Sequence, residues 1–264
     1  MKFCVLGSGS RGNVTYLESG NTRILIDAGM SGKGVQQRLA AINVEPSSID
    51  AILVTHEHND HIHGVGVLSR RASIPVFANP PTFSAAAKIF NRLFSYNEFE
   101  TGTSFYYRNL EIHPFSISHD TADPVGFRIS DGKYSLGYCT DTGRVSKLMQ
   151  HRLTACDAIV LESNHDIGML QNGNYPPYLK QRIRSGQGHL DNSEAAAFLH
   201  ELAHEKLQHV VLAHLSEENN HPEIAFRAAV EAVTNNSLCR EMVIRISVAS
   251  QNCAGELVSL SGKW

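Results

Sequence analysis

Residues 55–61 read Thr-His-Glu-His-Asn-Asp-His and come directly after the apolar run 51–54. A short apolar run of this kind is typical of a buried strand, so three imidazoles and a carboxylate crowd onto one strand end and the loop that leaves it. Core packing has no need of four such side chains at the spacing His-x-His-x-Asp-His, whereas a pair of divalent cations that share a water molecule does. The run therefore predicts a metal site.

The composition limits the class of protein that carries this site. A chain of 264 residues with 42% hydrophobic residues suits one large domain over residues 1–264. The net charge of −3 gives no overall basic field, so a polyanion would have to be held locally. The five cysteines form no Cys-x-x-Cys pair, and no apolar stretch approaches 18 residues. We therefore expect a cytoplasmic protein with neither a disulfide framework nor a membrane span.

Apolar runs and turn residues divide the chain into strands and helices. Strands are expected at 2–6, 14–19, 22–27, 50–54, 75–78, 104–107, 110–117, 125–130, 134–139, 157–161, 208–213, 241–248 and 256–260. Helices are expected after 29–31, near 61, from Pro80 through Phe94, and at 144–152, 192–205 and 222–235. Two halves that each run from strands to helices predict two sheets packed face to face and covered by helices. The stretch at about 163–190 interrupts this pattern and is expected to be an irregular active-site segment.

Four further residues end apolar runs elsewhere in the chain: Asp27, His119, Asp141 and His214. Each of them by itself would be interpreted as a turn residue. Sites in such folds form where strand ends meet, so together with the run at 56–61 these residues become a candidate ligand set.

The order of these residues resembles the metallo-β-lactamase superfamily over essentially the whole chain. The resemblance implies a four-layer αβ/βα sandwich, an α/β fold with a binuclear metal site at one edge. It implies two groups of ligands, namely His56, His58 and His119 for the first metal and Asp60, His61 and His214 for the second. Asp141 would bridge both metals, and Asp27 would orient the histidine loop.

The residue types at these positions narrow the chemistry. Imidazole and carboxylate ligands without thiolate suit two Zn²⁺ or Mn²⁺ ions. Cys139 is expected to be a buried structural residue rather than a ligand. Aspartate at position 141 argues against a true β-lactamase, and histidine at position 58 argues against the redox enzymes of this fold.

Local segments further resemble the YycJ/WalJ-type bacterial proteins, a branch that is implied to be a DNA exonuclease working from the 5′ end. These segments are 7–13, 161–166, 188–192 and 212–220. The expected reaction is in-line attack of a metal-bound hydroxide on phosphorus, with Asp60 or Asp141 holding its proton. His189 or His165 would supply the acid or contact the phosphate, and Glu162 would orient one of them.

Substrate contacts are expected from two stretches. The amides of the Gly/Ser-rich turn 7–13 would cradle a phosphate, and the residues expected to take part are Ser10, Arg11, Asn13 and Asn164. Lys180, Arg182 and Arg184 form the densest basic cluster and would bind a nucleic-acid backbone. Tyr175 and Tyr178 would stack on terminal bases. A tight turn, a solvated helix face and loop-stiffening packing are the structural interpretations of the same stretches.

Two other functions stay open at this point. The same metals would serve hydrolysis of a small molecule such as a lactone, a thioester or a cyclic phosphodiester. A non-catalytic binding module is disfavoured because every ligand position is filled.

Overall fold

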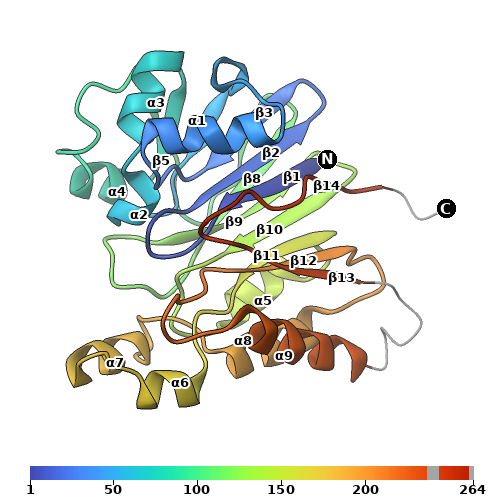
Figure 1. The fold of residues 1–264 in the computed structure, drawn as a ribbon. Helices are drawn as coiled ribbons and strands as arrows, with labels where there is room; N and C mark the ends of the chain where they lie inside the picture. Colours follow the sequence, from blue (N-terminus) through green and yellow to red (C-terminus); the bar gives the residue numbers. More distant parts are fainter. Residues whose placement is uncertain (237–243, 262–264) are drawn as a thin grey trace.

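The computed structural model describes residues 1–236 and 244–261, which contain two seven-stranded sheets (Figure 1). In the first sheet the strand order is β14-β1-β2-β3-β4-β5-β6, and in the second it is β13-β12-β11-β10-β9-β8-β7. The first sheet consists of β1 (Lys2–Gly7), β2 (Val14–Ser19), β3 (Thr22–Ile26), β4 (Ala51–Leu53), β5 (Pro75–Ala78), β6 (Ser95–Glu98) and β14 (Val258–Ser259). The second consists of β7 (Phe105–Tyr107), β8 (Leu110–Ser116), β9 (Val125–Ser130), β10 (Ser135–Cys139), β11 (Ala158–Glu162), β12 (His209–Ala213) and β13 (Arg245–Val248).

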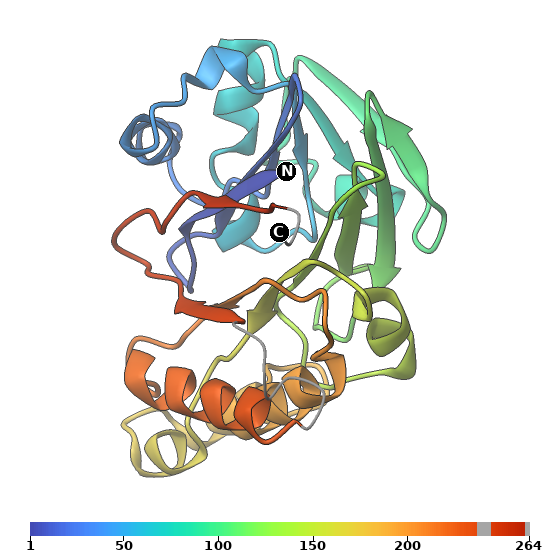
Figure 2. The ribbon, with the colours of Figure 1, turned by 90° about the vertical axis from the view of Figure 1, so that its right-hand side faces the viewer.

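Helices connect the strands, and several of them cover the outer faces of the two sheets. They are α1 (Gly32–Ala41), η1 (Pro46–Ser48), α2 (Asn59–Ile62), α3 (Val65–Ala72), α4 (Pro80–Ala85), α5 (Lys147–Leu153), α6 (Ile167–Asn172), α7 (Pro177–Ile183), α8 (Asn192–Leu202) and α9 (Pro222–Thr234). Figures 1 and 2 show α1 and α3 beside the first sheet and α5, α8 and α9 beside the second.

Three hydrophobic cores join these layers. Buried side chains of both sheets, including Phe3 and Phe127, form the core between the sheets. A second core joins the first sheet to α1 and α3, and a third joins the second sheet to α5, α8 and α9. The predicted αβ/βα sandwich is therefore confirmed.

The connections bring many strand ends to one edge. Strands β1 to β3 form the expected antiparallel meander, and β3, β4, β5 and β6 then run parallel to one another. In the second sheet β10 to β13 are also parallel. Because parallel strands end on the same side, the segments that leave β3, β4, β10, β11 and β12 are gathered for a shared site.

Several expected elements differ in the structure. The helix that begins at Pro80 ends at Ala85, so Phe94 does not lie on its apolar side and is 58% exposed. Strand β6 was not expected. The segment 163–190 holds the short helices α6 and α7, so it is not irregular throughout. Of the strand expected at 241–248, residues 241–243 lie outside the described residues.

Two expectations concern the described residues as a whole. Each of the four described cysteines, Cys4, Cys139, Cys156 and Cys253, is free, while Cys239 lies outside the described residues. Within residues 1–236 and 244–261, none of the helices is long and apolar enough to cross a membrane.

Candidate metal centre

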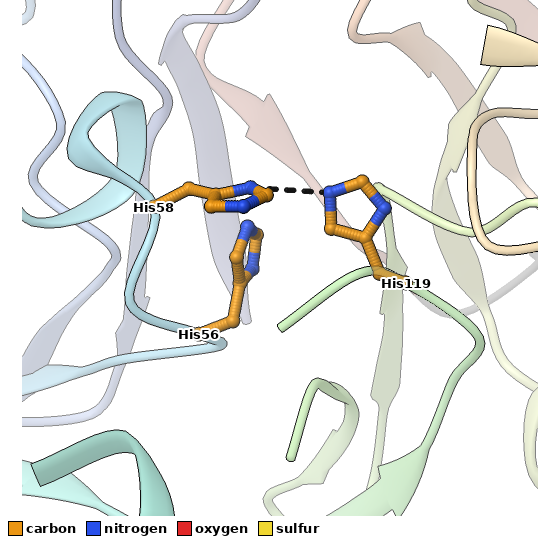
Figure 3. A group of neighbouring side chains, drawn as sticks. All are labelled: His56, His58 and His119. Carbon is orange, nitrogen blue, oxygen red and sulfur yellow. Dashed lines mark hydrogen bonds between the residues drawn. The ribbon is translucent and has the colours of Figure 1, made fainter. Parts of the chain in front are cut away.

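Three histidines from two loops form the first ligand group. His56 and His58 lie between β4 and α2, and His119 lies in the loop after β8. One ring nitrogen from each lies within 4.8 Å of the others, and His58 Nδ1 is 3.2 Å from His119 Nε2 (Figure 3). The rings meet edge to face and their nitrogens converge, which is the arrangement that a single cation requires.

A second group lies beside the first. It combines Asp60 and His61 of α2 with His214, which follows β12. Asp60 Oδ2 is 3.6 Å from both His61 Nε2 and His214 Nε2.

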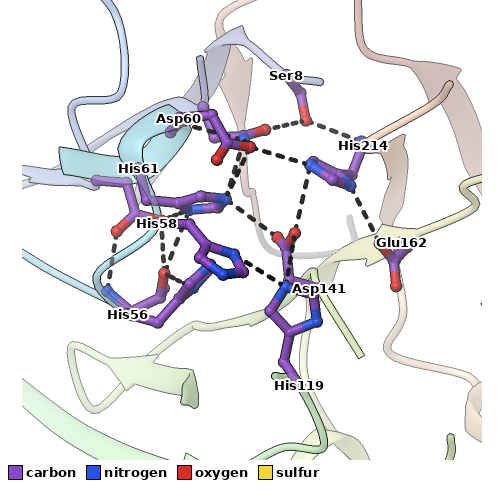
Figure 4. Close-up of polar contacts among 12 residues, drawn as sticks. Ser8, His56, His58, Asp60, His61, His119, Asp141, Glu162 and His214 are labelled. Carbon is purple, nitrogen blue, oxygen red and sulfur yellow. Dashed lines mark hydrogen bonds and ion pairs between the residues drawn. The ribbon is translucent and has the colours of Figure 1, made fainter. Parts of the chain in front are cut away.

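Asp141, which follows β10, lies between the two groups (Figure 4). Its Oδ2 is 3.2 Å from His61 Nε2, and its Oδ1 is 3.3 Å from His214 Nε2 and 3.9 Å from His119 Nε2. All seven residues expected as ligands are therefore brought together, with the one expected to bridge facing both groups.

Unsatisfied polar atoms show that the cluster fits cations. His56 Nε2, Asp141 Oδ2 and His214 Nε2 are buried and lack a hydrogen-bond partner within the described ranges. Such atoms are rare in folded proteins because each is costly unless something pairs with it. Imidazole nitrogens and carboxylate oxygens are the donors that Zn²⁺ and Mn²⁺ accept. The cluster is thus a divalent-metal-binding site.

The backbone at three of the strand ends is unusual. Asp27, Asp141 and His214 have φ values of 60°, 59° and 56°. This left-handed region disfavours most side chains but is tolerated best by Asn, Asp and His. The chain turns sharply at these residues, which allows each side chain to reach the common site.

Asp27 holds one ligand histidine in place. It is fully buried, and its Oδ2 accepts a hydrogen bond from His61 Nδ1 at 2.7 Å. The same carboxylate accepts bonds from the amide and the hydroxyl of Thr55 at 2.8 and 2.9 Å. His61 is thereby fixed with Nε2 directed toward the cluster, 3.2 Å from Asp141 Oδ2.

Glu162, the last residue of β11, holds two histidines in place. Its Oε1 lies 2.8 Å from His189 Nδ1 and 3.1 Å from His214 Nδ1. Its Oε2 accepts the amides of Thr142 and Leu190 at 2.9 and 3.1 Å. The sequence led us to expect one partner, His189 or His165, whereas the structure pairs Glu162 with His189 and the ligand His214.

The charges of the cluster shift the pKa values of its members. Burial acts to lower the pKa of His61, but the carboxylates of Asp141, Asp27 and Asp60 outweigh it and hold that pKa well above its usual range. Burial likewise opposes the rise of the His214 pKa to about 10, which Asp141, Asp60 and Glu162 cause.

The pKa values of two carboxylates of the cluster are lowered rather than raised. Burial acts to raise the pKa of Glu162, but His189 and His214 lower it to about 2. The imidazoles of His214, His61 and His56 hold the pKa of Asp141 well below its usual range against the same effect of burial. Protons therefore compete with metal ions for the imidazoles and not for these carboxylates.

Only one of the two candidate acid histidines lies in the cluster. The ring of His189 is centred 5.1 Å from those of His119 and His214, and one of its nitrogens lies within 4.8 Å of ligand atoms of Asp141, Glu162 and His214. His165 is buried and belongs to neither ligand group. Its backbone pairs with Asp191, while its Nδ1 lacks a hydrogen-bond partner among residues 1–236 and 244–261. His189 therefore lies with the ligand residues, whereas His165 is in none of the groups of described residues that could hold a metal ion.

The turn 7–13 does not form the expected phosphate cradle. Most of its amides already donate to acceptors within the protein, namely those of Ser8, Gly9, Arg11, Gly12 and Asn13. Asn13 is fully buried, with Nδ2 3.3 Å from Asp60 Oδ2, and Ser8 Oγ accepts the His214 amide at 2.8 Å. The turn therefore positions two ligands, which corrects the expectation that Asn13 contacts substrate.

Ser10 and Arg11 of the same turn lie at the surface. Ser10 is exposed, and the Arg11 guanidinium pairs with Glu217 and with Asn252 Oδ1 at 2.9 Å. Asn164 is buried and donates to the His214 carbonyl at 2.8 Å, so it also supports a ligand rather than facing substrate.

The three basic residues of the α7 cluster differ in their partners. Lys180 Nζ donates to the carbonyls of Gln171 and Gly173 at 2.8 and 2.7 Å and so ties α7 to α6. Arg182 pairs with Asp120, and Arg184 is exposed. Lys180 is thus committed to the fold, which corrects its expected role in binding substrate.

Sequence reasoning missed Asp120. This residue directly follows the ligand His119, and its Oδ1 lies 3.5 Å from His119 Nε2. Its position next to a ligand was the available signal, whereas its partner Arg182 is distant in sequence. Cys139 is buried and lies outside both ligand groups, and burial raises the pKa of its thiol.

Comparison with known proteins agrees with this architecture. A family model described as "Beta-lactamase superfamily domain" matches residues 22–215. The exodeoxyribonuclease WalJ of Streptococcus pneumoniae is 39% identical over 241 residues, which cover 90% of each chain. The exodeoxyribonuclease YycJ of Bacillus anthracis is 37% identical over 227 residues, or 85% of this chain and 86% of that protein.

A solved structure is similar over nearly the whole chain. The metallo-β-lactamase fold protein YhfI of Bacillus subtilis superimposes with a TM-score of 0.74 at 17% identity, covering 97% of this chain and 99% of that chain, which supports the fold alone. With its two ligand groups joined at Asp141, the chain belongs to the β-lactamase superfamily and, within it, to the family of the WalJ and YycJ proteins.

Proposed function

We propose that this protein is a metal-dependent hydrolase of nucleic acid, and specifically a DNA exonuclease that degrades from the 5′ end. The meeting of two ligand groups at Asp141 carries the hydrolytic part of the proposal, because such a pair of sites stabilises both the attacking and the leaving oxygen of a phosphodiester. Its similarity to exodeoxyribonucleases across 90% of both chains supports DNA as the substrate. We also propose that it works as a single domain in the cytoplasm, where its free cysteines stay reduced.

The metal ligands follow from the two groups. His56, His58 and His119 would hold one ion, Asp60, His61 and His214 would hold the other, and Asp141 would contact both. Two Zn²⁺ or Mn²⁺ ions bound there would supply an activated water molecule and neutralise the charge of the phosphodiester. Asp60 or Asp141 is the carboxylate placed to hold the proton of the attacking water.

His189 is the group that we propose for the leaving oxygen. Because its Nδ1 donates to Glu162, its Nε2 is left to contact a phosphate oxygen or to deliver a proton to the departing 3′ oxygen. Glu162 also holds His214, so one buried carboxylate sets the positions of a metal ligand and of the proton donor.

A substrate panel tests the proposal. Protein loaded with Mn²⁺ or Zn²⁺ would be assayed on DNA labelled at its 5′ or 3′ end, on RNA, on bis(p-nitrophenyl) phosphate and on a thioester. We expect mononucleotides to be released progressively from the 5′ end of DNA, and Asp141→Asn protein to be inactive. Turnover confined to the thioester would contradict the proposal.

A further inference from the structure

Arg182 on α7 lies at the edge of the first ligand group. Its Nε is 2.6 Å from Asp120 Oδ2, and its Nη2 is 3.1 Å from Asp120 Oδ1. That same Oδ1 lies 3.5 Å from His119 Nε2 and 3.9 Å from His58 Nε2. The Asp120 carboxylate therefore lies between the guanidinium and two proposed metal ligands. The Arg182 side chain is still 49% exposed.

The turn after α7 is fixed to the cluster. Ser118 Oγ donates to the carbonyl of Gly186 at 2.6 Å, and His119 Nδ1 is 3.1 Å from the carbonyls of Gln187 and Gly188. The His189 amide donates to the Ile183 carbonyl at the end of the helix. These bonds hold α7 (Figure 1) in a fixed position relative to His119.

Tyr178 shares a face of α7 with Arg182. The two residues are four positions apart, which places their side chains side by side on a helix. Tyr178 is 74% exposed although its ring is large, so it is not used for packing. An exposed aromatic ring beside an exposed guanidinium is the combination that binds the base and the phosphate of a single-stranded nucleotide.

The ion pair with Asp120 does not prevent Arg182 from binding a phosphate. Arg182 and Asp120 are 49% and 33% exposed, so solvent and salt screen their ion pair and a phosphate can compete with the carboxylate for the guanidinium. A guanidinium binds phosphate through two parallel N–H donors, as it here binds Asp120.

We propose that Tyr178 and Arg182 form a subsite for the unpaired nucleotide next to the scissile phosphodiester. Arg182 binds the phosphate of this nucleotide, and Tyr178 stacks on its base. A base inside a duplex is already stacked on its neighbours, so the subsite makes a single-stranded end the preferred substrate. This inference rests on the proposed nuclease function and specifies which form of DNA it takes.

The test compares a single-stranded oligodeoxynucleotide with the same strand carrying one abasic residue beside the scissile position. Tyr178→Ala should lower kcat/KM on the natural strand by about 10- to 100-fold, the range expected for loss of one base–aromatic stack. It should also abolish the preference of the wild-type protein for the natural over the abasic strand. Tyr178→Phe keeps the ring and should restore both. Arg182→Gln should lower kcat/KM and reduce the slope of log affinity against log salt by about one.

Tyr106→Ala is the matched control, because Tyr106 is 75% exposed on the edge strand β7. It should behave as the wild-type protein does. The subsite would be overturned if Tyr178→Ala matched this control, or if it lowered kcat/KM equally on the natural and the abasic strand. DNA digestion by the wild-type protein would still support the nuclease function. If the wild-type protein digests no DNA, both proposals fall together.

Discussion

At the scale of single residues, the centre depends on buried carboxylates that hold imidazoles, and Asp27 provides the clearest test. Asparagine keeps the size of this side chain and tolerates its φ of 60°, but removes the charge that accepts the His61 Nδ1–H. We expect Asp27→Asn to weaken binding at the second metal site by about 10- to 100-fold. Competition with a fluorescent chelator measures the affinity.

Asp131→Asn is the control for this change, since Asp131 caps the turn between β9 and β10 by accepting the amides of Lys133 and Tyr134. Its metal affinity should equal that of the wild-type protein. Equal affinities for Asp27→Asn and the control would mean that Asp27 does not act through His61.

The two candidate acid histidines should respond differently to substitution. His189→Ala removes a ring of the cluster, and we expect kcat on DNA to fall by about 10²- to 10⁴-fold with metal content retained. His165→Ala removes a buried ring outside both ligand groups, so its main effect should be a lower melting temperature. Steady-state kinetics, metal analysis and thermal melting on the same preparations distinguish them. Full turnover by His189→Ala with both metals bound would remove this residue from the mechanism.

At the scale of elements, close packing in the turn after α7 fixes His189. A Cβ added at Gly188 would lie 2.1 Å from the Ile183 carbonyl oxygen, whereas one at Gly186 would meet nothing closer than 4.0 Å. Gly188→Ala must therefore shift the turn, which should cost about 1–3 kcal/mol of stability and lower kcat on DNA by about 100-fold. Gly186→Ala in the same turn should match the wild-type protein in denaturant unfolding and in kinetics. Similar behaviour of the two variants would show that this contact does not set the position of His189.

Elements were predictable where a run of apolar residues marked them. The strands β3, β4, β10, β11 and β12, which lead into the centre, are almost wholly buried and were therefore visible in the sequence. Helices α6 and α7 are only 6 and 7 residues long, too short for a helical period to appear. Strand β6 is an edge strand with mostly exposed side chains, so it lacks the apolar signal on which the prediction relied.

The candidate site was predictable to a similar degree. The ligand set stands at strand ends in a fixed order, and the sequence displays that order. Which polar residues face substrate depends on long-range contacts that the sequence does not display. Asn13 and Asn164 were expected to contact substrate, but both are buried against ligands, and the partnership of Arg182 with Asp120 joins residues 62 positions apart.

At the scale of the whole molecule, the centre joins the two sheets. Asp60 and His61 come from segments between strands of the first sheet, whereas His119, Asp141 and His214 follow strands of the second. Metal ions bound to both sets link the sheets at one edge and stabilise the folded state by mass action. At free metal about 100-fold above Kd, we expect the melting temperature to rise by roughly 5–10 °C over protein stripped with a chelator.

This stabilisation should grow with pH. The folded-state pKa values of His214, about 10, and of His61 are raised by carboxylates. In stripped protein their contribution to stability is therefore complete below about pH 6.5 and is lost as the pH rises toward 10. Metal binding strengthens over the same range because fewer protons compete for the imidazoles. Both effects widen the difference in melting temperature between loaded and stripped protein from pH 6.5 to pH 9, as thermal melting would measure. His214→Asn should abolish most of the widening, and His200→Asn, outside the cluster, should preserve it. A constant difference would mean that these imidazoles are not where metal and protons compete.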